Sequence, residues 1–224
     1  MRELKGKQVI LQDHDLKRRE EANRRYLMKL TNDNLLFNYK VEAGRYDGRD
    51  IPEDAHGGDG RRQSARSADI FLGHWLSAAA IRYHETGDLE LKLKADLILD
   101  ELAECQKDNG GQWAAPIPEK YLHWVAQGKA IWAPQYNIHK LFMGLVDMHQ
   151  FTGSQKALDI ADRFADWFVA WSSTFTREKF DDILDMETGG MLEAWADLLE
   201  LTGNEKNTLF CWNGITAADC SVRY

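Results

Sequence analysis

The sequence is poor in the features that mark several large classes of protein. Its three cysteines, Cys105, Cys211 and Cys220, have no Cys-x-x-Cys spacing, so neither a disulfide framework nor a metal site is expected in this chain. Lysine and arginine number 28 against 36 acidic residues and form no basic block, which argues against a nucleic-acid partner. No run approaches the roughly 18 apolar residues of a membrane span. Because no apolar segment follows the charged N-terminal residues, we expect no signal peptide and a cytoplasmic protein.

The sequence is rich in core-forming residues and in helical periodicity. Hydrophobic residues make up 44% of the chain, and from Asp69 onward they recur with a helical period. Three helical segments end in Thr-Gly followed by a small polar residue, at Thr86–Asp88, Thr152–Ser154 and Thr202–Asn204. The glycine can end one helix in the left-handed conformation, and the next residue can cap the following helix. Each motif therefore predicts the tight turn of a helical hairpin.

Unevenly spaced hairpins with long loops between them predict an all-α fold. We expect an (α/α)6 toroid of helical hairpins, of which this chain is an N-terminal half with about three hairpins. The inner helices would precede each Thr-Gly turn and the outer helices would follow it. In the first outer helix we expect Leu93, Leu97, Leu102 and Cys105 to be buried. Residues 32–46, upstream of the hairpins, are expected to be irregular.

The stretch from Trp132 to Gly153 is central to this reading. Pro134 favours an extended approach, and Asn137 is expected to cap the helix that follows. An apolar stripe then runs along that helix, with His139 beside it in the first turn. A histidine at a helix mouth can face a ligand, but it can equally be a half-buried structural residue.

Aromatic residues gather in the loop that leads to this helix. Trp113, Tyr121, Trp124 and Trp132 all lie between residues 107 and 135. Aromatic faces bind sugars by covering their apolar C–H faces, although such rings can also simply pack the loop.

Two carboxylates lie at the start of the third inner helix. Glu187 and Glu193 are expected to face the same mouth as His139, and paired carboxylates carry out glycosidic-bond chemistry. The alternative is that the helix dipole alone favours acidic residues there. His74, near the start of the first inner helix, is another lone histidine, which can likewise face a ligand or be a structural residue.

Four segments in order resemble the β-L-arabinofuranosidase glycoside hydrolases, a family long known only as a domain of unknown function. They are Leu72–Ala78, Leu102–Gln106, Trp132–Lys140 and Glu187–Glu193. Shorter matches at Tyr26-Leu27 and at residues 34–37 extend the resemblance over roughly residues 8 to 206.

The resemblance implies an (α/α)6 barrel that hydrolyses terminal β-L-arabinofuranosides with retention and leaves L-arabinose. His139 would hydrogen-bond sugar hydroxyls, and Gly189–Met191 would line the same subsite. The candidate substrate-binding residues are His139, Glu193, Tyr136, His74, Glu187 and Trp132. One departure is Asp69-Ile70, where family members often carry Gly-His.

The family's catalytic groups have no counterpart here. Its nucleophile is a zinc-held cysteine in a Glu-x-Cys segment, and a separate glutamate is the acid/base; both belong to later hairpins. Zinc is therefore expected only in a full-length family member, with no cofactor in this chain. The catalytic residues are left unassigned.

The sequence changes character after Lys206. Residues 1–206 read as the N-terminal part of the catalytic domain, whereas residues 207–224 have no helical period. A choice of permitted codons lets a shifted frame encode an amphipathic helix, so we interpret 207–224 as an out-of-frame tail. The alternative is a short natural terminus.

These features predict a truncated, inactive glycoside hydrolase whose partner is an arabinose-containing glycan. The open edge of a half toroid also predicts self-association. The alternatives are a non-catalytic helical carbohydrate-binding or scaffold protein, and another (α/α)6 sugar enzyme such as an epimerase.

Overall fold

The computed structural model describes residues 10–46, 71–187 and 190–205, and every regular element in those ranges is an α-helix. The predicted all-α fold is therefore confirmed. The helices are α1 (Asp15–Lys29), α2 (Asn32–Glu42), α3 (Phe71–Thr86), α4 (Leu89–Asp108), α5 (Lys120–Ala126), α6 (Pro134–Thr152), α7 (Gln155–Ser172), α8 (Arg177–Met186) and α9 (Met191–Thr202). None of these helices is both long enough and apolar enough to cross a membrane. The expected tail at 207–224 lies outside the described residues.

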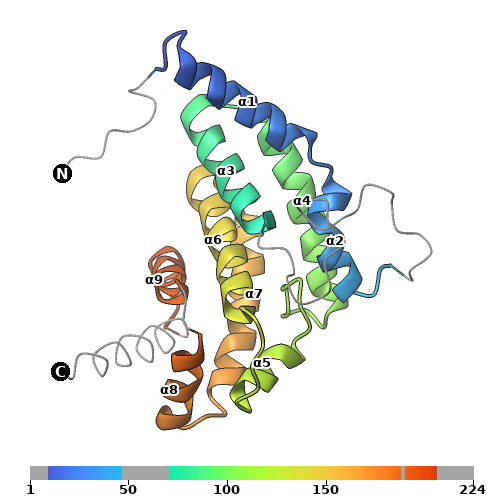
Figure 1. Cartoon of the computed structure of the whole chain (residues 1–224), viewed down its shortest axis with the longest axis vertical. Helices are drawn as coiled ribbons and strands as arrows, with labels where there is room; N and C mark the ends of the chain where they lie inside the picture. Colours follow the sequence, from blue (N-terminus) through green and yellow to red (C-terminus); the bar gives the residue numbers. More distant parts are fainter. Residues whose placement is uncertain (1–9, 47–70, 188–189, 206–224) are drawn as a thin grey trace, which may run out of the picture.

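The hairpin helices form two rows. In the inner row α3 packs on α6 and α6 packs on α9, and in the outer row α4 packs on α7. Figure 1 shows α3 and α6 running alongside each other, with α9 seen nearly end-on beside α6, so that α9 crosses α6 steeply. Each inner helix precedes a Thr-Gly turn and each outer helix follows one, as the sequence predicts.

The turns have the predicted chemistry. Gly87, Gly153 and Gly203 adopt positive φ angles of 72°, 73° and 60°. Asp88 then caps α4 and Ser154 caps α7, each by accepting a backbone N–H with its side-chain oxygen. The helix expected after the third turn lies outside the described residues.

The prediction of an irregular segment at 32–46 is wrong for most of its length. The side-chain oxygen of Thr31 accepts the N–H of Asn34 and starts α2. The fully buried Leu35 and Leu36 and the nearly buried Tyr39 then face the core, and α2 packs on α4. Tertiary burial thus organises a segment whose composition favours loops.

The predicted burial of the first outer helix is half correct. Leu102 and Cys105 are buried, but Leu93 and Leu97 are 54% and 58% exposed. The core-facing stripe of α4 runs instead through Leu91, Ala95, Ile98 and Leu99. Because leucines lie on both faces of α4, the helical period alone did not distinguish them.

An aromatic cluster joins α6, α7 and α9 and holds the site in place. Phe142 stacks on Phe164 with ring centroids 5.0 Å apart, and Trp195 lies 4.9 Å from Phe142. All three rings are at most 1% exposed, so the inner face of α6 rests on a close-packed support.

Candidate functional site

The site is built around the first turn of α6. Ala133 precedes the helix in the left-handed conformation, with φ 49° and ψ 41°, and Pro134 is the first helical residue. Proline suits that position because its missing N–H would have no helical partner there. The predicted start at Asn137 is therefore wrong. The side-chain nitrogen of Asn137 instead donates to the carbonyl oxygen of Ala133 at 2.7 Å.

Glu187, from the connection between α8 and α9, caps this turn. Its two carboxylate oxygens accept the backbone N–H groups of Gln135 and Tyr136, each at 2.9 Å. Burial raises the pKa of the Glu187 carboxyl, and the two backbone hydrogen bonds oppose that rise. The positive end of the α6 dipole also favours the ionised carboxylate. Both oxygens of Glu187 are therefore occupied by backbone N–H groups of α6 in this structure.

His139 lies one turn further along α6 and is only 6% exposed. Among the described residues, neither of its ring nitrogens has a hydrogen-bond partner. Burial lowers the pKa of His139, Lys140 lowers it further, and Glu193 opposes both. The imidazole is therefore neutral near pH 7 and offers one donor and one acceptor.

The backbone of Gly190 lies against the same imidazole. A Cβ at Gly190 would be 2.4 Å from Cε1 and 2.6 Å from Nε2 of His139, so any side chain there would force the imidazole to shift. Gly189, which the resemblance also assigns to this subsite, lies outside the described residues.

The other two inner helices add polar groups near His139. His74 on α3 and Glu193 on α9 are both exposed, and both influence the pKa of His139. The pKa of His74 is lowered by partial burial and by Lys140. The predicted candidates on α3, α6 and α9 thus lie close enough to interact electrostatically.

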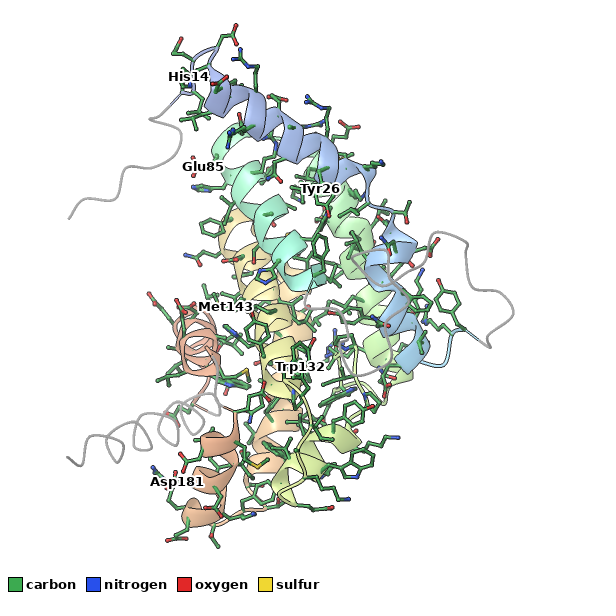
Figure 2. The ribbon with its side chains drawn as sticks, in the orientation of Figure 1. His14, Tyr26, Glu85, Trp132, Met143 and Asp181 are labelled. Carbon is green, nitrogen blue, oxygen red and sulfur yellow. The ribbon has the colours of Figure 1, made fainter. Side chains whose placement is uncertain are left out.

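The aromatic loop divides into two kinds of residue. Trp113 is 2% exposed and packs edge-on against Phe164, so for this ring the packing alternative is correct. Trp132 is 60% exposed, and Figure 2 places it beside the start of α6. Tyr136 is 36% exposed, with its ring centroid 6.3 Å from that of His139.

A separate hollow of about 320 Å³ lies at α5. Tyr121 and Trp124 line it, with ring centroids 5.5 Å apart, together with Lys120, Ala130 and Ile131. These two loop aromatics therefore lie at a surface recess, whereas Trp113 is in the core.

The arrangement can bind a polar ligand that also has apolar faces. It combines a neutral buried imidazole, exposed aromatic rings and a nearby carboxylate, which are the groups that recognise sugars. The resemblance had placed Gly190 in the subsite of His139, but sequence reasoning missed the carboxylate cap. Pro134 was the available signal for where α6 begins, because proline is favoured at the first helical position.

The described helical hairpins fit an all-α toroid. The chain belongs to the β-L-arabinofuranosidase family, because the model described as "Beta-L-arabinofuranosidase, GH127 catalytic domain" matches residues 8–209. No curated protein matches the sequence.

A solved structure supports the fold. It is described as "Crystal structure of Ara127N-Se, a GH127 beta-L-arabinofuranosidase from Geobacillus Stearothermophilus T6", and it matches with a TM-score of 0.58 and 20% sequence identity. The match covers 92% of this chain and 32% of that one, so the present chain spans about a third of its length.

Proposed function

We propose that this chain supplies part of the sugar-binding site of a glycoside hydrolase acting on terminal β-L-arabinofuranosides with retention of configuration, which leaves L-arabinose. The observation that carries the proposal is His139, which is 6% exposed and whose two ring nitrogens have no hydrogen-bond partner within the described part of the chain. Buried polar groups are nearly always hydrogen-bonded, so an imidazole in this state fits a site completed by ligand or water. Family membership supports an arabinose-containing glycan as the ligand.

Five of the six candidate residues have a distinct part in this proposal. His139 donates to one sugar hydroxyl and accepts from another. The exposed rings of Trp132 and Tyr136 cover the apolar face of the sugar. His74 and Glu193 provide further polar contacts from the neighbouring inner helices.

We also propose that the 224 residues bind the sugar without hydrolysing it. The resemblance implies that the nucleophile is a zinc-held cysteine in a Glu-x-Cys segment, and these 224 residues contain no such segment. The described part of the chain holds no group of three histidine, cysteine or acidic side chains suited to a metal, so these residues do not fit the family's zinc site. Burial raises the pKa of the Cys105 thiol, which is the reverse of nucleophile activation.

An out-of-frame tail at 207–224 and an open toroid edge complete the proposal. Sequencing the coding DNA across Lys206 tests the tail: a second frame that continues into a Glu-x-Cys segment is expected, and the absence of one contradicts it. Sedimentation tests the edge, since self-association is expected and a monodisperse monomer at micromolar concentration contradicts it.

Calorimetric titration with methyl β-L-arabinofuranoside tests the binding site. We expect wild-type protein to bind and His139→Gln to lose about tenfold in affinity, as for one or two hydrogen bonds. His123→Gln is the matched control, because His123 is exposed on α5, and its affinity should equal that of the wild type. Equal affinity of the wild type and His139→Gln would contradict the assignment.

A further inference from the structure

We propose that Glu187 is a positioning residue that sets the direction of the His139 imidazole through the first turn of α6, and that it does not contact the substrate. The significance for sugar binding rests on the function proposed above. The positioning itself follows from two contacts: Glu187 and Gly190, between α8 and α9, both touch the start of α6.

The first turn of α6 has no cap of its own. Ala133 makes no side-chain capping bond, and Pro134 has no N–H to offer. The N–H of Asn137 already bonds to the carbonyl oxygen of Ala133 at 3.2 Å. The N–H groups of Gln135 and Tyr136 are the two that remain, and Glu187 accepts both. A single carboxylate from the next hairpin thus completes the hydrogen bonding of this turn.

The same connection touches α6 at a second point. Gly190, three residues after Glu187, lies against the ring of His139, where a Cβ would be 2.4 Å from Cε1. The ring of Tyr136, whose N–H is held by Glu187, meets the His139 ring edge to face. Glu187 and Gly190 therefore hold the backbone at one end of the turn and the imidazole at the other.

The geometry favours a carboxylate. Two acceptor oxygens meet two N–H donors, whereas the amide of glutamine would place an NH₂ group against one of those donors. Among the described residues no ammonium or guanidinium group forms an ion pair with Glu187 in the structure. The positive end of the α6 dipole is therefore the charge that balances it. A ligand-facing group held in this way can keep one direction before the ligand arrives.

Histidine NMR tests the positioning without any sugar. The Cε1–H signal of His139, assigned by its loss in His139→Gln, is followed as a function of pH. Glu187→Gln and Glu187→Ala loosen the turn and admit water, so the pKa of His139 should rise toward the ordinary histidine value. Gly190→Ala should also move the His139 signal, because its Cβ displaces the ring.

Ser154→Ala is the matched control. It removes the capping oxygen of α7, which accepts the N–H of Ala157 at 3.3 Å, and leaves the α6 cap intact. It should lower stability and leave the pKa of His139 unchanged. An unchanged His139 signal in folded Glu187→Gln and Gly190→Ala would overturn the proposal, even if Glu187→Ala fails to fold.

Sugar affinity separates this proposal from the proposed function. Methyl β-L-arabinofuranoside should bind Glu187→Gln about tenfold more weakly than the wild type, and Ser154→Ala as tightly as the wild type. If wild-type protein binds no sugar while the His139 pKa still responds to Glu187→Gln, the function fails and the positioning stands. If sugar binds equally to wild type and Glu187→Gln with an unchanged His139 pKa, the positioning fails alone.

Discussion

Gly73 and Gly144 bring the backbones of α3 and α6 into direct contact. A Cβ on Gly144 would lie 2.6 Å from the carbonyl oxygen of Gly73, and a Cβ on Gly73 would lie 2.0 Å from the carbonyl oxygen of Lys140. Because His74 follows Gly73 directly, this close approach also places His74 beside the turn that carries His139.

Alanine at either glycine should therefore destabilise the protein. The atoms that the new Cβ meets are backbone atoms, which cannot move aside as a side chain can. We expect Gly73→Ala and Gly144→Ala each to cost about 3 kcal/mol or more of unfolding free energy, measured by urea denaturation. Gly110→Ala is the comparison, because Gly110 has open space around it and only its positive φ opposes a side chain. Its cost should be about 1 kcal/mol, and equal costs at all three sites would contradict the close packing.

Asp88 should stabilise the first hairpin in a pH-dependent way. Burial would raise its pKa, but hydrogen bonds from Arg24, Arg82 and the N–H of Leu91 lower it to about 2. Because the carboxyl pKa is lower in the folded than in the unfolded state, the ionised Asp88 stabilises the folded protein at pH values above its unfolded-state pKa. This stabilisation is lost as the pH falls through about 2. We expect Asp88→Asn, which keeps a capping oxygen, to cost about 1–2 kcal/mol at pH 7.

That cost should shrink as the pH falls from about 4 to about 2 in thermal unfolding of both proteins. Asp96→Asn is the control, since Asp96 pairs with Lys92 on the surface of one helix. It should cost no more than about 0.5 kcal/mol. A difference between Asp88→Asn and wild type that is constant with pH would contradict the ion-pair account.

Asp147 should act in the opposite direction. Burial raises its pKa, a hydrogen bond with Ser77 opposes this, and the charges of Asp197 and Glu193 raise it further. A raised carboxyl pKa means that ionisation destabilises the folded state at neutral pH. Asp147→Asn keeps an acceptor for Ser77 and removes the charge, so its unfolding free energy at pH 7 should rise by up to about 1 kcal/mol. A less stable Asp147→Asn protein at pH 7 would show that the charge itself is needed.

Two tryptophans of one loop should respond differently to truncation. Trp113→Ala removes a buried ring whose N–H donates to the carbonyl oxygen of Ile117 at 2.9 Å, and should cost about 3–5 kcal/mol. Trp132→Ala removes an exposed ring and should change stability by less than about 0.5 kcal/mol. If the proposed site is correct, Trp132→Ala should still weaken sugar binding in calorimetry. Full affinity in Trp132→Ala would remove that ring from the site.

The turns and the order of the hairpins were predictable because their chemistry is local. A left-handed glycine followed by a capping residue acts within a few positions, and Gly87-Asp88 and Gly153-Ser154 behave accordingly. The start of α6 was mispredicted because both Pro134 and Asn137 can begin a helix. The turn is completed by a carboxylate more than 50 residues away, which no local pattern reveals.

The candidate site was predictable in location more than in contacts. The helical period placed His139 beside the core, and the structure confirms its burial. The sequence suggested a substrate-facing Glu187, whereas its two oxygens accept N–H groups of α6. Likewise, Trp113 and Trp132 looked equivalent until their burial was known. Contacts between distant segments decide these cases.

The central proposal is that these 224 residues bind a terminal β-L-arabinofuranoside at His139 and do not cleave it. Saturation-transfer NMR of methyl β-L-arabinofuranoside with the protein and added zinc reports binding and cleavage in one sample. We predict transfer to the sugar protons with wild-type protein, weaker transfer with His139→Gln, and no free L-arabinose signals over time. Absence of transfer with folded wild-type protein, or the appearance of free L-arabinose, would contradict the proposal.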